Sequence, residues 1–365
     1  MNKIIAKPVG MFELFYDLVF VYAISRITAM IHHPIAGKIP LITYLQFLLV
    51  VIVVMQIWLY QTLYFNRYSK NRLIDIAGLL INMFTAVYLA NNINTEWRIT
   101  FLYFNIAMAV MVGALFLQYL FGGVKSADNQ SFLLTLGIEF ILIVVGVMIG
   151  YPTGMIFCIA GALVGFLFPL VISKRFDPEK INFPHLVERV GLIVIIAFGE
   201  AIVNLATYFN KNEPIIHPVL LFLSLVLMFA SYVTFSEKII NHHQYSKGFV
   251  LMYSHIVIVV AILMITVVTI YLNLKHVDSN FLNFLIISTI GIYYLAVFVN
   301  FYYSKSQCQL SSKDILSLLL IYIAGAIIVL VLKGSKIGMM FILFIWNLAF
   351  YLFVLIKARR LSKNK

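Results

Sequence analysis

Long apolar runs recur along this chain, and they constrain its fold more than any other feature. About a dozen segments reach roughly 20 residues, the length that an α-helix needs to cross the hydrocarbon core of a bilayer. The composition agrees, because 63% of the 365 residues are hydrophobic and only 11% are charged. A typical soluble domain is about 25% charged. The sequence therefore predicts an all-α polytopic integral membrane protein.

Twelve transmembrane helices are expected, joined by short connections. Their predicted spans are 10–32, 41–65, 73–93, 98–121, 131–150, 154–173, 185–208, 215–236, 248–273, 281–304, 312–332 and 337–356. The longest polar connector, DPEKINFP at 177–184, would divide the chain into an N-terminal six-helix half at 1–176 and a C-terminal half at 185–365. No cleavable signal is expected, because the first apolar stretch contains two carboxylates.

Lysine and arginine are distributed unevenly between the two sides of the predicted membrane. The side that holds the N-terminus has eighteen and the other side has six, while Arg26 and Arg189 inside helices complete the total of 26. The positive-inside rule then predicts that both termini are cytoplasmic. The net charge of +12 belongs to these loops, so no nucleic-acid partner is expected.

A faint internal repeat supports two equal halves. Glu13 opens the first helix and Glu188 opens the seventh, 175 residues later. The tripeptide at 68–70, Tyr-Ser-Lys, returns at 245–247, an offset of 177 residues. Six helices per half would start both halves on the same side, which favours a parallel 6+6 pseudo-repeat about an axis along the membrane normal.

Two segments place ionisable side chains inside predicted helices. They are FELFYDLVFVYAISRI at 12–27 and HLVERVGLIVIIAFGEAIV at 185–203. A charge at the centre of the membrane costs at least about 2.5–3.5 kcal/mol, so such groups commonly line a substrate or proton pathway. The candidate pathway residues are Glu13, Asp17, Arg26, Glu188, Arg189 and Glu200.

These charges sort by depth into two layers if the first and seventh helices are neighbours. The inner layer would hold Glu13, Asp17, Glu188 and Arg189, and the outer layer would pair Arg26 with Glu200. Two carboxylates close together in low dielectric repel each other, so one takes a proton or a cation lies between them. Three acids against one arginine favour a protonatable carboxylate. The alternative is that the ion pairs only lock the two helices together, although buried pairs seldom add net stability.

Other polar residues are weaker candidates. Glu139 is an isolated acid in the fifth helix, and His255 in the ninth is either a proton carrier or a simply hydrogen-bonded histidine. Neither the histidines nor Cys158 and Cys308 have metal-binding or disulfide spacing, so no metal and no cofactor is expected. Nucleotide-binding and familiar hydrolase motifs are also absent from the sequence.

Taken together, the two charged segments resemble the bacterial low temperature requirement A (LtrA) family of multi-spanning membrane proteins. The resemblance rests on F-E-L-F-Y-D-L-V-F at the start and on H-x-x-E-R-x-G-L with a later G-E pair, and it extends over nearly the whole chain. It implies a bacterial cytoplasmic-membrane location and adds His185 as a secondary site candidate. Val190 and Ala201 stand where the family often has histidine and serine, so roles that need those two groups are not carried over.

Two functions follow from these patterns. The favoured one is a gradient-driven secondary transporter, in which intramembrane carboxylates bind and release protons while a small or amphipathic solute crosses the lipid bilayer. The alternative is an intramembrane lipid-handling or lipid-modifying enzyme that uses acid–base groups at one membrane surface. An enzyme is the less favoured of the two, because Asp17, Arg26 and Glu200 are predicted to lie away from the helix ends.

Overall fold

The computed structural model describes residues 4–209 and 214–363, with side chains described up to residue 359, and no β-strand is found in these ranges. Its α-helices are α1 (Met11–Ala29), α2 (Leu41–Arg67), α3 (Leu73–Asn91), α4 (Trp97–Gly122), α5 (Ala127–Ile149), α6 (Thr153–Val171), α7 (Phe183–Asn204), α8 (Ile216–Thr234), α9 (Phe249–Asn273), α10 (Ser279–Val299), α11 (Ser312–Val331) and α12 (Lys336–Lys363). Short 3-10 helices lie at Ser173–Arg175, Pro178–Lys180, Leu205–Tyr208, Asn300–Tyr303 and Ser306–Cys308, and a π-helical turn lies at Phe235–Ile239. Lys3, Lys211 and Lys365, which entered the charge count, lie outside the described residues.

Eleven of the described helices are long and apolar enough to cross a membrane. The exception among the twelve is α1, whose 19 residues carry Glu13, Asp17 and Arg26. The all-helical polytopic class is therefore confirmed, with eleven candidate spans. That α1 also crosses the membrane, and that both termini are cytoplasmic, stay predictions.

The described chain forms two compact units. Unit 1 contains residues 1–31, 41–196 and 243–252, and unit 2 contains residues 32–40, 197–242 and 253–365. The boundary falls within α7 and again near the start of α9, so it does not coincide with the connector at 177–184. Compactness and sequence repetition are different properties, and the 6+6 repeat stays a prediction.

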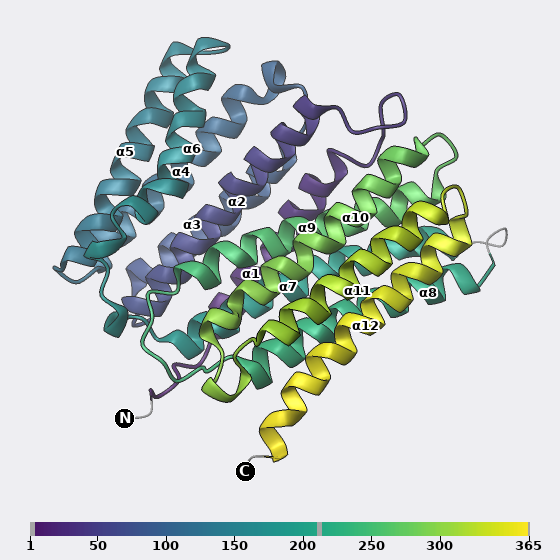
Figure 1. The fold of residues 1–365 in the computed structure, drawn as a ribbon. Helices are drawn as coiled ribbons and strands as arrows, with labels where there is room; N and C mark the ends of the chain where they lie inside the picture. Colours follow the sequence, from purple (N-terminus) through teal and green to yellow (C-terminus); the bar gives the residue numbers. More distant parts are fainter. Residues whose placement is uncertain (1–3, 210–213, 364–365) are drawn as a thin grey trace. The chain divides into compact units, whose positions relative to one another are not determined.

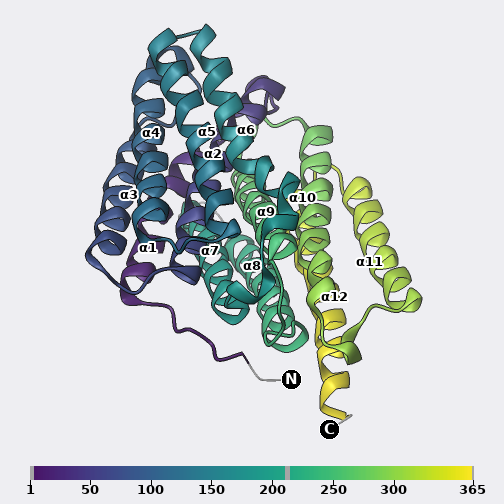
Figure 2. The same cartoon turned by 90° about the vertical axis from the view of Figure 1, so that its left-hand side faces the viewer.

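Unit 1 is built around α2. Every residue from Val53 to Asn66 is buried, because this helix contacts α1, α4 and α6 and forms hydrogen bonds to side chains on α3, α5 and α7. Figures 1 and 2 show α2 to α6 running side by side. A helix that is surrounded by neighbours is mostly apolar on every side, so the polar side chains of α2 are buried against other helices instead of facing water.

The α5–α6 hairpin in unit 1 is closely packed, as its small-xxx-small glycine spacing predicts. A Cβ atom on Gly146 would lie 2.5 Å from the Gly154 carbonyl oxygen and 2.6 Å from Cys158 Sγ. The N-terminus of α5 is capped by Ser126, whose side chain accepts a hydrogen bond from the Asn129 amide. The two helices therefore approach each other backbone to backbone.

Unit 2 contains the end of α7, all of α8, most of α9, and α10, α11 and α12. Asn347 of α12 donates to Ser224 of α8 over 2.7 Å and accepts from the Tyr294 hydroxyl of α10 over 2.9 Å. Figure 2 shows α11 beside α10 and α12, with little else against it. Only 17% of the most hydrophobic stretch of α11 is buried. Gly325 of α11 packs against the Trp346 ring of α12.

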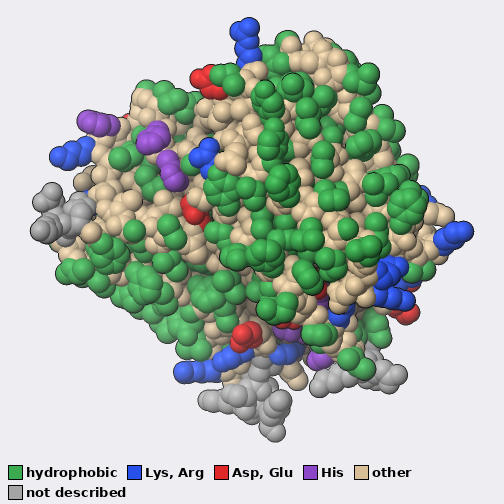
Figure 3. All heavy atoms as spheres, turned by 180° about the vertical axis from the view of Figure 1, so that it is seen from behind, with side chains coloured by type: hydrophobic (Ala, Val, Ile, Leu, Met, Phe, Trp, Pro, Cys, Tyr) green, Lys and Arg blue, Asp and Glu red, His purple; other side chains and the backbone are tan. Residues whose placement is uncertain are grey.

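The surface is largely apolar. Large hydrophobic side chains are exposed on many helices, including Phe84 on α3, Val171 on α6 and Val331 on α11. Figure 3 shows such side chains spread over the middle of one face, with most Lys and Arg side chains toward its edges. Soluble proteins rarely expose apolar patches of this extent, whereas a lipid-facing surface requires them.

Candidate functional site

An acid–base cluster joins α1 and α7 within unit 1. It consists of Glu13, Asp17, His185 and Arg189, all at most 4% exposed. Each helix presents its two members four residues apart, so both lie on one face. Arg189 Nη2 donates to Asp17 Oδ1 over 2.8 Å, and its Nη1 lies 3.5 Å from Glu13 Oε2. His185 Nε2 lies 3.3 Å from the same Glu13 oxygen.

The central helix α2 supports this cluster from a third side. Trp58 donates its indole N–H to Asp17 Oδ1 over 2.7 Å, and the Arg189 guanidinium lies 5.6 Å from the centre of the Trp58 ring. Thr62 Oγ1 accepts a hydrogen bond from Arg189 Nη2 over 3.3 Å. Trp58 and Thr62 are four residues apart, so one face of α2 holds both ends of the Asp17–Arg189 ion pair in place.

Asn66, one further turn along α2, determines the tautomer of His185. Its Oδ1 accepts the Asn182 amide N–H over 3.1 Å, which assigns its Nδ2 as the group that faces His185 Nδ1 over 3.0 Å. Because that amide donates, His185 Nδ1 is the acceptor and the ring proton is on Nε2, which points at Glu13. The imidazole is therefore neutral in this arrangement, and its Nε2–H group is directed at the Glu13 carboxylate 3.3 Å away.

The charges of the cluster do not balance. With His185 neutral, two carboxylates face one guanidinium among the described residues. Several of its buried polar atoms have no hydrogen-bond partner in the described chain, where most buried polar atoms are satisfied. They are Glu13 Oε2, Asp17 Oδ2, His185 Nε2 and Arg189 Nε and Nη1, and the hydroxyl of the neighbouring Tyr16 also has none. The site can therefore take up a proton and bind further polar groups.

An N-terminal segment, residues 4–10, crosses the end of the cluster. Asn182 caps α7 by accepting the His185 amide over 3.1 Å, and it also bonds the backbone at Ile5 and Lys7. The Lys7 ammonium donates to the Phe65 and Ser69 carbonyl oxygens at the end of α2. Burial lowers the pKa of Lys7 from its ordinary value, while the carboxylates of Glu13 and Asp75 act in the opposite direction.

The structure brings together three of the four residues predicted for the inner layer and excludes the fourth. Glu13, Asp17 and Arg189 meet as expected, but Glu188 is exposed. Its placement in the buried layer is wrong because consecutive helical residues point about 100° apart. The buried face of α7 here is the His185–Arg189 face, and Glu188 lies beside it.

The remaining candidates lie elsewhere. Arg26 is half-buried in unit 1, whereas Glu200 is buried in unit 2, where Asn204 donates to its carboxylate over 2.9 Å. Their proposed pairing therefore stays a prediction. His255 in unit 2 shares a hydrogen bond with the Tyr232 hydroxyl over 3.0 Å, as expected for a histidine that is simply hydrogen-bonded. Glu139 forms a separate site with Gln56.

Sequence reasoning missed the uncharged members of the site. Trp58, Thr62 and Asn66 repeat every four residues along α2, and Tyr16 lies between the two acids of α1. The i, i+4, i+8 spacing of polar side chains within a long apolar helix is the signal that indicates them. Among the described residues, no group of three His, Cys, Asp or Glu side chains is arranged to hold a metal ion.

Eleven candidate spans and a buried, charge-unbalanced cluster define a polytopic α-helical membrane protein with a buried polar site. The family model of the bacterial low temperature requirement A protein (LtrA) matches residues 8–348, which include both charged segments. The chain belongs to the LtrA family. Comparison with curated proteins and with solved structures gave no match.

Proposed function

We propose that this protein is a proton-coupled secondary transporter and that the acid–base cluster is its proton switch. The observation that carries the proposal is the charge imbalance: two buried carboxylates share one guanidinium, and several polar atoms around them lack hydrogen-bond partners. Ionisable groups are expensive inside a membrane and typically mark proton or substrate pathways there.

The geometry supports a simple switch. In the observed arrangement Asp17 and Glu13 both face Arg189, which holds α1 and α7 together. A proton on Asp17 would remove one of these charges and weaken its bond to Arg189. The guanidinium would then be free to bind an anionic group of the solute or to pair with Glu13 alone. Protonation of Asp17 would thereby change the contact between α1 and α7.

The wider scheme follows from the sequence. Two six-helix halves would rock about a central site, with both termini in the cytoplasm and the protein in the bacterial cytoplasmic membrane. The solute would be small or amphipathic, and the proton gradient would drive its movement. The charge asymmetry of the loops and the weak repeat support this arrangement.

Proton flux into proteoliposomes tests the proposal. Asp17→Asn keeps the Oδ1 acceptor used by Trp58 and Arg189 and changes only the partnerless Oδ2 position, so the fold should persist. We expect at least a tenfold loss of gradient-driven proton movement. Glu179→Gln, an equivalent change at an exposed position of the connector, is the matched control. Normal flux through a folded Asp17→Asn variant would contradict the proposal.

One observation favours a second function, an enzyme that acts on lipid head groups. The four cluster residues lie in the first two turns of α1 and α7, close to one end of both helices, where a head group would be found. His185 and Glu13 would supply the acid–base chemistry. Detergent-solubilised protein incubated with bacterial lipid would then yield a modified lipid without any gradient, and mass spectrometry would detect it.

A further inference from the structure

A second buried acid lies on the other side of α2. Glu139 of α5 is fully buried, and its Oε1 accepts a hydrogen bond from Gln56 Nε2 of α2 over 2.5 Å. Glu139 Oε2 and Gln56 Oε1 have no partner among the described residues. An acid and an amide thus face each other in the interior of unit 1, with one oxygen of each available.

Two glycines of α6 make room for this carboxyl group. A Cβ atom on Gly165 would lie 2.2 Å from Glu139 Oε2, and one on Gly161 would lie 3.2 Å from the Glu139 carbonyl oxygen. The Gly165 carbonyl is bonded by the Tyr60 hydroxyl of α2 over 2.6 Å. Helices α2, α5 and α6 therefore close around the acid, and any larger residue at position 165 would displace it.

No cation contacts Glu139 in the described structure. Three titratable groups on the surrounding helices, Tyr60 of α2, Tyr119 of α4 and Cys158 of α6, each bond a backbone carbonyl oxygen. The Glu139 carboxyl group accepts its hydrogen bond from Gln56. An ionised carboxylate buried without a cation is far less favourable than the neutral acid. The surroundings of Glu139 therefore favour the protonated form.

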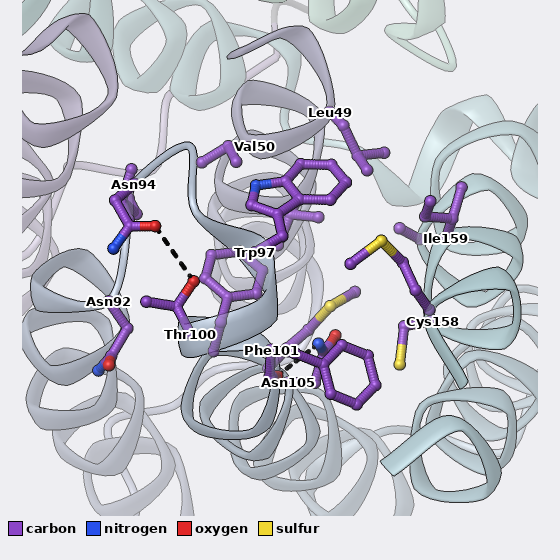
Figure 4. A pocket seen from close by; sticks show the side chains of 16 residues that line it. Leu49, Val50, Asn92, Asn94, Trp97, Thr100, Phe101, Asn105, Cys158 and Ile159 are labelled. Carbon is purple, nitrogen blue, oxygen red and sulfur yellow. Dashed lines mark hydrogen bonds between the residues drawn. The ribbon is translucent and has the colours of Figure 1, made fainter. Parts of the chain in front are cut away.

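A small cavity leads toward this acid from one end of unit 1. It measures about 50 Å³, room for a small number of water molecules, and lies between α2, α4 and α6 (Figure 4). It runs from the exposed Asn94, which bonds Thr100 over 3.4 Å, to the buried Val53 and Ala162. Val53 lies three positions before Gln56, and Ala162 lies three positions before Gly165, so each is less than one helical turn from a residue that is next to Glu139.

The two acid sites lie on opposite faces of α2. The cluster uses Trp58, Thr62 and Asn66, whereas the second site uses Gln56 and Tyr60. Gln56 and Trp58 are two residues apart, about 200° of rotation. The cavity continues along the N-terminal half of α2, while the cluster extends along its C-terminal half. Each site therefore faces a different end of the same membrane-length helix.

We propose that Glu139, with Gln56, is a second proton-binding site of this protein, which holds a proton in the neutral acid and exchanges it with water through the cavity between α2, α4 and α6. This proposal extends the proposed function. It rests on that function only where it treats Glu139 as a second binding site for the transported proton. The cluster would serve one end of α2 and Glu139 the other.

Infrared spectroscopy of the reconstituted protein at neutral pH tests the protonation state. We expect a C=O band of a protonated carboxyl group that is present in the wild type, absent from Glu139→Gln and retained in the control Glu179→Gln. A hydrophobic carbodiimide, which reacts with protonated carboxyl groups, should modify Glu139 in the wild-type chain, as located by mass spectrometry. This second measurement needs no variant. A wild type without the band and without the modification overturns the proposal.

Transfer to heavy water tests the route. The Glu139 band should shift as its proton exchanges, and Ala162→Leu, which fills the inner end of the cavity, should slow that shift at least tenfold. Ala86→Leu is the matched control, because Ala86 lines a separate small cavity with Phe20 and Met111. Equal exchange rates in the two variants overturn the route. Since neither readout involves transport, failure of the proposed function would leave these results unaffected, and the reverse also holds.

Discussion

Two groups of buried charges in this molecule differ in how completely they are satisfied. The Asp314–Lys357 pair in unit 2 has one acid and one base, and Lys357 also donates to the Gln309 carbonyl while Asp314 accepts from Ser311. No atom of that pair is among the buried polar atoms that lack partners. The acid–base cluster has two acids, one guanidinium and five atoms without a hydrogen-bond partner, and the neighbouring Tyr16 hydroxyl is a sixth.

From this difference we infer which buried charges are structural. A balanced pair that uses all its hydrogen-bonding atoms gains nothing from a further ligand, and it closes the end of α11 through a capping box. An unbalanced cluster gains from a proton or a polar group. Substitutions at Arg189, Asp314, Asn66 and Glu188 test that contrast.

Removing the guanidinium of the cluster should have the largest effect. Arg189→Met leaves Glu13 and Asp17 buried without a cation, and breaking a buried pair in this way costs about 3–5 kcal/mol. Thermal unfolding in detergent measures it. The loss should shrink as the pH falls, because protonated carboxyl groups need no cation, and it should shrink when Asp17→Asn is added. A variant as stable as the wild type at high pH would show that Arg189 does not balance these acids.

The balanced pair should respond in the opposite way to the cluster. Asp314→Asn leaves Lys357 without a counter-charge, so we expect a loss of about 3 kcal/mol in unfolding free energy and normal proton flux per folded molecule. Asp17→Asn should lose flux with little change in stability. The two assays are applied to both variants in parallel. If Asp314→Asn abolishes flux while it stays folded, charge balance does not separate structural from functional sites.

The Asn66 amide provides a smaller, more specific test. Asn66→Ala removes the donor to His185 Nδ1, so the ring proton should distribute over both nitrogens, and the lost hydrogen bond should cost about 1–2 kcal/mol. Nitrogen NMR of labelled histidine reports the tautomer. Gln61→Ala, which removes another buried amide of α2 that accepts from Asn82, should cost a similar amount and leave the His185 tautomer unchanged. An unchanged tautomer in Asn66→Ala would contradict the assignment.

The helices were predictable because bilayer thickness imposes a length on apolar runs. The predicted span 98–121 compares with Trp97–Gly122 for α4, and 41–65 compares with Leu41–Arg67 for α2. The largest error is at α12, predicted to end at 356 but extending to Lys363. Hydropathy reports where the apolar segment ends, whereas a helix continues through Lys and Arg, which favour helix about as well as Leu and Met.

The site was only partly predictable, for a different reason. Charges in an apolar helix are conspicuous, so Glu13, Asp17 and Arg189 could be identified from the sequence. Trp58 and Asn66 are neutral and more than 100 residues from α7, so their part in the site depends on which helices pack together. Helical periodicity narrows the faces but does not select the partners, and it allowed Glu188 to be assigned to the wrong face.

Glu188 should show the smallest effect, and it sharpens the contrast within a single helix. It is next to Arg189 in the sequence but exposed, so Glu188→Gln should change the unfolding free energy by less than about 0.5 kcal/mol, as is usual for surface substitutions. Proton flux should stay within about twofold of the wild type, since among the described residues no hydrogen bond or ion pair joins this side chain to the cluster. A tenfold loss of flux in the folded variant would mean that the exposed acid itself takes part in proton uptake, and the switch would then extend beyond the buried cluster to the surface of α7.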